Sequence, residues 1–136
     1  MLHQDEELKI VPFKPGMELN VKGVPKCGCD RFSINVGHSR GNVALHFDVR
    51  FSYGNDQRVI VLNTRKNGHW QEEVRDRCFP FQRGQQFEVT ITFADGSFYI
   101  NLHNGHVVQF PNRLGDKQYD SLWFYGDVLL NGLSIK

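Results

Sequence analysis

Apolar and polar residues alternate with a period of two along most of the 136-residue chain. Such alternation predicts β-strands that bury one face and expose the other. The clearest case is residues 42–51, where one side of the predicted strand carries only apolar residues: Val43, Leu45, Phe47, Val49 and Phe51. The same pattern predicts strands at 8–11, 17–24, 31–36, 58–63, 87–93, 98–102 and 107–110, and strand material at 122–125, 128–130 and 133–135.

Turn residues divide these runs and predict how they connect. Asp95-Gly96 and Asn104-Gly105 lie between alternating runs and indicate hairpins, hence a three-stranded meander over 87–110. Phe79-Pro80-Phe81 predicts a short edge-like piece, because proline cannot donate to a strand ladder. Residues 114–120 form the one predicted helical turn. About ten or eleven short strands with almost no helix indicate an all-β fold of two packed antiparallel sheets.

The polar side of residues 42–51 carries a different kind of pattern. It places a histidine, an aspartate and an arginine on one face, and the next run, 58–63, ends in an asparagine. A third short stretch adds a tryptophan, a glutamate and an arginine. If these segments are neighbouring antiparallel strands, one open sheet face presents the whole set: His46, Asp48, Arg50, Asn63, Trp70, Glu73 and Arg75.

The chemistry of this set suits a sugar. Arginine offers a fixed fork of donors, asparagine offers a donor and an acceptor, and carboxylates offer acceptors, so together they match a row of hydroxyl groups. Trp70 offers an aromatic face for a patch of sugar C–H groups. A phosphate fits less well, because the carboxylates of Asp48 and Glu73 would repel an anion.

Three strings of residues carry a resemblance to a known family. They are His46-Phe47-Asp48-Val49-Arg50, Val61-Leu62-Asn63 and Trp70-Gln71-Glu72-Glu73-Val74-Arg75, followed by Phe79-Pro80-Phe81 and Phe110-Pro111-Asn112-Arg113-Leu114. Their spacing resembles the galectin carbohydrate-recognition motif, and the resemblance covers the chain from about Leu8 to its last residue. It implies a galectin-like jelly-roll β-sandwich and a single recognition domain over 1–136. About the first seven residues are polar, and we expect them to be disordered.

The resemblance also implies a function and a role for each residue. The expected function is binding of β-galactosides such as lactose or N-acetyllactosamine, with no metal and no cofactor. His46 and Arg50 would hydrogen-bond the axial 4-hydroxyl of galactose, and Asn63 and Glu73 the 6-hydroxyl. Trp70 would stack on the galactose C–H face, while Arg50, Glu73 and Arg75 would also reach the second sugar.

Asp48 and Val49 stand where the galectin motif usually has Asn and Pro. An ionised aspartate only accepts hydrogen bonds, so the galactose 4-hydroxyl would have to turn its proton toward Asp48. On this reasoning Asp48→Asn should tighten lactose binding about threefold to tenfold, which corresponds to one hydrogen bond.

The resemblance further predicts assembly and location. Prototype galectins commonly pair two-fold through terminal strands, and here 8–11 and 129–135 offer such edges. We therefore expect a homodimer that crosslinks glycans and glycoproteins. No secretory signal is evident at the N-terminus, so we expect a cytoplasmic protein that is also exported to the extracellular space by a non-classical route.

Charge, hydropathy and cysteine content exclude several partners and sites. Sixteen Lys and Arg against fifteen Asp and Glu give no electrostatic reason for nucleic-acid binding, and no apolar run is long enough for membrane insertion. The odd number of cysteines, Cys27, Cys29 and Cys78, predicts free thiols. Neither Cys27-Gly28-Cys29 nor the pair His103 and His106 has the partners that a metal site needs.

Two other function classes use the same residues. A glycoside hydrolase needs two carboxylates, for which Asp48 and Glu73 are candidates. Arg50 and Arg75 beside them would favour ionised carboxylates, which cannot donate a proton, so we expect no enzymatic activity. The alternative to a lectin is a galectin-fold structural or interaction protein with weakened or lost sugar binding, since a fold alone does not define a function.

Overall fold

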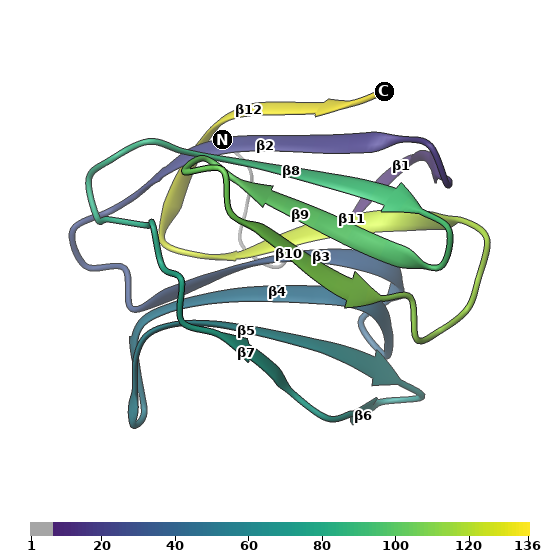
Figure 1. The fold of residues 1–136 in the computed structure, drawn as a ribbon, viewed down its shortest axis with the longest axis horizontal. Helices are drawn as coiled ribbons and strands as arrows, with labels where there is room; N and C mark the ends of the chain where they lie inside the picture. The colour runs from purple at the N-terminus through teal and green to yellow at the C-terminus, as the bar shows by residue number, and fades with distance from the viewer. Residues whose placement is uncertain (1–6) are drawn as a thin grey trace.

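Twelve strands form two antiparallel sheets in the computed structural model, which describes residues 7–136 (Figure 1). Sheet A has seven strands, in the order β1 (Leu8–Phe13), β11 (Tyr119–Gly126), β3 (Arg31–Ser39), β4 (Asn42–Tyr53), β5 (Asp56–Lys66) and β6 (His69–Trp70), with β7 (Val74–Asp76) also paired to β5. Sheet B has five, in the order β10 (Val107–Pro111), β9 (Ser97–Leu102), β8 (Phe87–Ala94), β2 (Glu18–Pro25) and β12 (Val128–Ile135).

The chain passes repeatedly between the two layers. The strand β2 lies in sheet B although its neighbours in sequence, β1 and β3, lie in sheet A, and β11 and β12 are likewise divided between the sheets. The strands β8, β9 and β10 form the predicted meander. These connections make a jelly-roll β-sandwich, which confirms the two packed sheets predicted from the pattern and the jelly roll implied by the resemblance.

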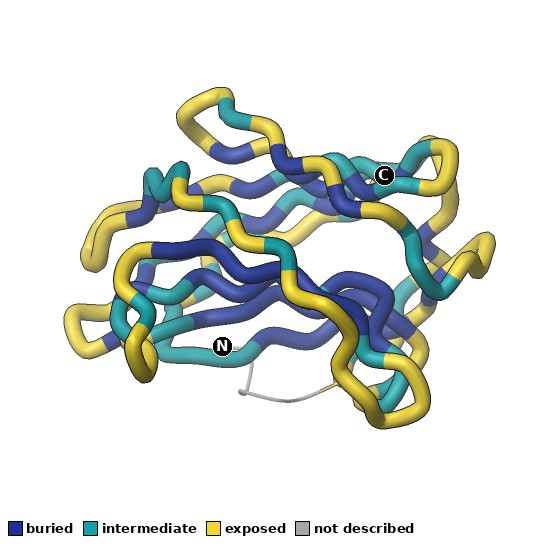
Figure 2. Tube along the Cα trace, turned by 60° about the horizontal axis from the view of Figure 1, so that its bottom comes forward, coloured by how far each residue is buried: buried dark blue, intermediate teal, exposed yellow. Residues whose placement is uncertain are grey.

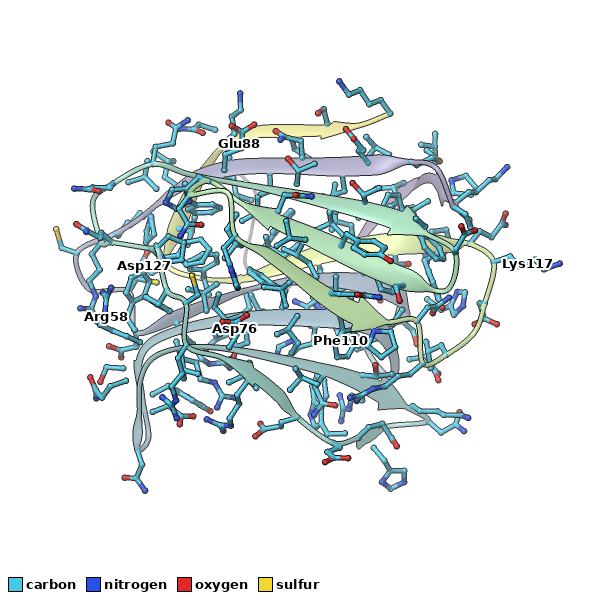
Figure 3. The ribbon with its side chains drawn as sticks, viewed as in Figure 1. Arg58, Asp76, Glu88, Phe110, Lys117 and Asp127 are labelled. Atoms are coloured by element: carbon cyan, nitrogen blue, oxygen red, sulfur yellow. The ribbon has the colours of Figure 1, made fainter. Side chains whose placement is uncertain are left out.

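The space between the sheets holds a phenylalanine-rich core. The inward face of β4 is buried at every apolar position, and Phe47 has no exposed surface. The ring of Phe32 from β3 stacks on Phe87 from β8 at a centroid distance of 4.9 Å, so the two sheets meet through aromatic contacts. Figure 2 shows buried segments in the middle of the strands and exposed segments at the loops. Phe110, labelled in Figure 3, is another fully buried ring of this core.

The outer face of sheet A is also covered over its central strands. Ser33, Asn35, Asp48 and Asn63 are polar residues of β3, β4 and β5 that are less than 5% exposed. Burial of a polar group is costly unless it is hydrogen-bonded. Within residues 7–136 every buried side-chain nitrogen or oxygen has a partner. The outer face of sheet A is therefore a layer of hydrogen-bonded polar side chains that longer side chains cover.

Two local predictions are wrong. The segment 114–120 contains no helical turn, because Gly115 adopts a φ of +77° and the Asn112 side chain bonds the backbone of Gly115 and Asp116 instead. Phe79-Pro80-Phe81 pairs with no strand, although Phe81 is buried in the core. Asn67 and Gly68, with φ of 49° and 81°, form a further tight turn between β5 and β6 that the sequence analysis does not predict.

The expected disorder of the first seven residues falls mainly on residues 1–6, which lie outside the described residues. From residue 7 onward, no helical segment has the length and apolar character that a bilayer crossing by a helix requires.

Candidate functional site

Strand pairing brings the predicted polar set together on the outer face of sheet A. The strands β4, β5 and β7 are neighbours, with His46 opposite Asn63 and Val61 opposite Arg75. Trp70 of β6 lies opposite Arg65 of β5. The predicted adjacency of these three segments is therefore confirmed.

A groove of about 410 Å³ lies over these strands, and we call it the primary groove. Five of the seven predicted residues line it: His46, Arg50, Asn63, Trp70 and Glu73. Its lining also includes four residues that the sequence analysis does not select: Arg31, Tyr53, Val61 and Gln71. Arg75 and Asp48 take part in the site from outside this lining.

Trp70 forms an exposed aromatic wall of the primary groove. Its side chain belongs to a two-residue strand and is 48% exposed, although it is one of the largest apolar side chains of the molecule. The ring of His46 contacts it at a centroid distance of 4.7 Å, and the guanidinium of Arg65 lies 5.5 Å from its ring centroid. The indole is thus held in place while about half of its surface stays exposed to a ligand.

Asp48 lies beneath the groove and not on its surface, which corrects the position predicted from the sequence. Its side chain has no exposed surface, and its two carboxylate oxygens accept hydrogen bonds from two arginines. Arg31 Nη1 donates to Oδ1 at 3.1 Å, and Arg50 Nε donates to Oδ2 at 2.8 Å. The carboxylate therefore anchors Arg31 and Arg50, and a sugar hydroxyl has no path to it.

Asp56, at the start of β5, continues this network of charges. It accepts from Arg75 Nη1 at 2.7 Å and from Arg50 Nη1 at 2.6 Å, while Arg75 Nη2 donates to Glu73 at 2.9 Å. Hydrogen bonds from Arg75 and Arg50 hold the pKa of the Asp56 carboxyl below its usual range. Asp56 follows a turn in the sequence and resembles an ordinary turn residue there, so its part in the site is visible only in the structure.

Asn63 is fixed by contacts from two other segments. Its Nδ2 donates to the carbonyl of Gln71 at 3.0 Å, and its Oδ1 accepts from the Thr64 amide at 2.7 Å. Arg113, from the loop after β10, donates to the Glu72 carbonyl at 2.7 Å and approaches Asn63 Oδ1 at 3.4 Å. The arginine thereby holds the β6–β7 segment against the sheet. The sequence string around Phe110 contains Arg113, yet gives no sign of this contact.

His46 presents a hydrogen-bond acceptor to the groove. Its Nδ1 lies 2.6 Å from Asn35 Oδ1, and Asn35 Nδ2 in turn donates to Ser33 Oγ and the Trp123 carbonyl. Because Asn35 Oδ1 can only accept, Nδ1 carries the proton and a neutral ring exposes the lone pair of Nε2. Burial lowers the pKa of His46 to about 4, which keeps the ring neutral near pH 7. Arg50 beside it offers donors, so a hydroxyl can give its proton to His46 and accept one from Arg50.

The lowered pKa of His46 predicts a pH-dependent stability. An unfolded histidine titrates near pH 6.5, so between pH 6.5 and 4 the unfolded chain binds more protons than the native protein, and stability falls as pH falls. The free energy of unfolding should drop by an amount approaching about 3 kcal/mol over this range. Urea unfolding at a series of pH values measures it, with His46→Gln as the control that lacks the group. Equal pH slopes for the two proteins would contradict this account.

The comparisons with known proteins agree on one family. The family model described as galactoside-binding lectin matches residues 7–135. Congerin-2 of Conger myriaster is 49% identical over 125 residues, which cover 91% of this chain and 92% of that protein. Galectin-2 of Mus musculus is 42% identical over 112 residues, covering 82% and 83%. A solved structure of lactose- and MES-liganded congerin II has a TM-score of 0.91 at 46% identity and covers 96% of this chain and 98% of that chain.

Proposed function

This chain belongs to the galactoside-binding lectin family, and from that premise we propose that its primary groove binds β-galactosides such as lactose and N-acetyllactosamine. One observation carries the proposal. The half-exposed indole of Trp70 stands beside a neutral His46 acceptor and an Arg50 donor, within a groove of about 410 Å³. An aromatic face next to a donor and acceptor pair is what a galactose ring, with its C–H patch and axial hydroxyl, requires.

Each residue of the groove then has a role. His46 accepts from the galactose 4-hydroxyl and Arg50 donates to it, while Asn63 and Glu73 take the 6-hydroxyl and Trp70 stacks on the ring. Arg75 does not line the groove, but its bond to Glu73 lets it act near the second sugar. Asp48 acts indirectly by holding Arg50.

Selectivity follows from the axial 4-hydroxyl. In glucose this hydroxyl is equatorial and leaves His46 and Arg50 without their partner. A buried polar group that loses its partner costs about 1–3 kcal/mol. Galactosides should therefore bind and glucosides should not.

Calorimetric titration with lactose tests this function. We expect saturable binding of lactose, and no heat of binding from glucose or cellobiose in matched cells. If lactose also gives none, the protein is a galectin-fold structural or interaction protein, which is the alternative that the sequence leaves open.

We propose in addition that the protein binds β-galactosides without hydrolysing them. A general acid must hold a proton near the scissile bond. Asp48 is buried between Arg31 and Arg50, and Glu73 accepts a hydrogen bond from Arg75, so neither carboxylate is placed for that role. Incubation with a chromogenic β-galactoside should release no dye above the buffer rate, and steady release that depends on protein concentration would refute the proposal.

The edge strands support a homodimer as the working assembly. The strand β1 ends sheet A and β12 ends sheet B, and Val11, Leu129 and Leu133 on them are at least 40% exposed. Joining such edges across a two-fold axis pairs open backbone groups and covers apolar side chains. Two recognition sites on one dimer would crosslink glycans. Sedimentation should give about twice the 15.7 kDa of one chain. A single species of chain mass at micromolar concentration would exclude the dimer.

The proposed location is both cytoplasmic and extracellular. Cys27 is exposed and Cys29 buried, and none of the three cysteines forms a disulfide, which fits synthesis in a reducing compartment. Burial raises the pKa of the Cys29 thiol to about 11, so that thiol resists oxidation outside the cell. Immunodetection in both the cytosolic fraction and the medium of intact cells tests this. Detection in one of the two alone would reject the proposed dual location.

A further inference from the structure

A segment that carries part of the sugar site has few strand contacts of its own. Residues 71–86 join β6 of sheet A to β8 of sheet B, and β7 is the only strand within them. The strand β7 pairs with β5 through three residues. Residues 71–73 and 77–86 belong to no strand. Backbone pairing therefore fixes little of the segment, although it includes Glu73 and Arg75.

Side chains from a hairpin of the opposite sheet hold this segment. The hairpin consists of β9 and β10 of sheet B, and the loop after β10 continues it. The three contacts are His103 Nε2 with the Pro80 carbonyl at 2.9 Å, His106 Nε2 with Asp76 Oδ2 at 2.8 Å, and Arg113 Nη1 with the Glu72 carbonyl at 2.7 Å. Residues 72–80 are thus fastened to sheet B at both ends and in the middle.

The middle contact lies directly beside Arg75. Side chains alternate along β7, so Arg75 is on the outer face of sheet A with Val61, which is opposite it and lines the primary groove. Asp76, labelled in Figure 3, is on the other face, where His106 meets its Oδ2. Its Oδ1 accepts from the Cys78 amide at 2.9 Å. His106 therefore anchors the strand residue that follows Arg75.

His106 is itself held at the end of the hairpin turn. Its amide donates to Asn104 Oδ1 at 3.1 Å, and its carbonyl accepts from the Leu102 amide at 2.8 Å. An ionised carboxylate only accepts, so the histidine Nε2 donates to Asp76 in a charge-assisted hydrogen bond. The side chains of His106 and Asp76 are 35% and 24% exposed, so water screens this contact only in part.

The two ends of the segment serve different sugars, and this step rests on the proposed function. Glu73 lies next to the residue that Arg113 holds, and it takes the galactose 6-hydroxyl. Arg75 lies next to the residue that His106 holds, and it acts near the second sugar. A binding group needs its supporting contacts to stay within a fraction of an ångström of its working position. A shift of β7 would therefore displace Arg75 and leave the galactose half of the site in place.

We propose that His106 is a positioning residue of the sugar site. Through Asp76 it holds Arg75 in reach of the second sugar, and it thereby sets the preference of the protein for a disaccharide over a single galactose. His106 does not line the primary groove, so it acts without touching the sugar. A hairpin of sheet B thus takes part in recognition on the outer face of sheet A.

Titrations with lactose and with methyl β-galactoside, followed by NMR, test the proposal. In His106→Ala the ratio of lactose affinity to methyl β-galactoside affinity should fall about threefold to tenfold, the loss expected from one hydrogen bond. The affinity for methyl β-galactoside itself should stay within about twofold of the parent protein. His106→Gln should restore much of the ratio, because its NH₂ group can donate to Asp76 in place of Nε2. A ratio within one protein is insensitive to a general loss of stability.

Further variants show whether His106 acts through Asp76. Asp76→Ala should lower the ratio, and adding His106→Ala should lower it no further, because the contact is already lost. Gln109→Ala is the matched control and should leave the ratio unchanged, since Gln109 is an exposed residue of β10 whose side chain bonds Ser97 Oγ within sheet B.

The outcomes separate this inference from the proposed function. An unchanged ratio in His106→Ala, no recovery in His106→Gln, or additive losses in the double variant overturns the inference and leaves lactose binding by the primary groove standing. Failure of the parent protein to bind lactose overturns both.

Discussion

Trp70→Ala is expected to remove measurable lactose binding while leaving the protein folded. The indole lies on a two-residue strand, is 48% exposed and contacts the ring of His46 at the surface, so its removal opens no cavity in the core. A central aromatic anchor of a binding site contributes about 2–4 kcal/mol on truncation, or roughly thirtyfold to a thousandfold in affinity. The free energy of unfolding should change by about 0.5 kcal/mol or less, as for other surface substitutions.

Calorimetry with lactose and urea unfolding measure the two effects on the same variant. Trp70→Phe is the matched control, since a smaller aromatic face retains part of the stacking and should retain part of the affinity. Lactose binding by Trp70→Ala within threefold of the parent protein would place the sugar elsewhere and refute the assigned role of the primary groove.

The sequence predicts on which face of the sheet each site residue lies, but not whether its side chain is buried or exposed. A period of two assigns His46, Asp48 and Arg50 to one side of β4, and strand pairing confirms that they share it. The alternation of apolar and polar residues along one strand does not predict which side chains from other strands cover that face. Arg31 comes from β3 and closes over Asp48, with Tyr53 and Tyr125 packed against it, and these contacts join segments far apart in the sequence.

For Trp123 the sequence suggests the burial of the side chain but not the face of the sheet on which it lies. Trp123 lies in an apolar run, a pattern typical of a core strand, and it is only 5% exposed. Yet Trp123 is opposite Asn35 on the outer face of sheet A and lines a groove of about 250 Å³ beside the primary groove. Low exposure there comes from covering side chains such as Arg40, whose guanidinium carbon lies 6.0 Å from the indole centroid. When other side chains cover a polar sheet face, an apolar residue on that face cannot be distinguished from a core residue by its neighbours in sequence.

Replacing Asp48 is expected to cause the largest loss of stability in the site. Asp48→Ala leaves the guanidinium groups of Arg31 and Arg50 without their buried partner. Removing one member of a buried ion pair costs about 3–5 kcal/mol. Urea unfolding near pH 7 measures this loss. Asp120→Ala is the control, because the exposed Asp120 makes a 3.9 Å ion pair with Lys9 and accepts a long hydrogen bond, 3.4 Å, from Ser121 Oγ. Its loss should cost about 1 kcal/mol or less.

Asp48→Asn tests the buried geometry more finely, because the structure reverses the sign that the sequence predicts. The amide keeps the shape of the carboxylate but can accept from only one of the two arginines, and its NH₂ group then faces the other donor. We expect lactose binding about threefold to tenfold weaker, the cost of one lost hydrogen bond that positions Arg50. Tighter lactose binding by Asp48→Asn would show that the native carboxylate lowers the affinity of the site for the sugar.

A double-mutant cycle that combines Asp48→Asn with Arg31→Ala identifies the cause of that weakening. Without Arg31 the introduced amide can turn its oxygen to Arg50 and its NH₂ group away from any donor, so the two substitutions should not add. The coupling free energy between residues in one such network is about 0.5–3 kcal/mol. If Asp48→Asn weakens lactose equally in both backgrounds, Arg31 does not compete for the amide, and the effect arises at Arg50 alone.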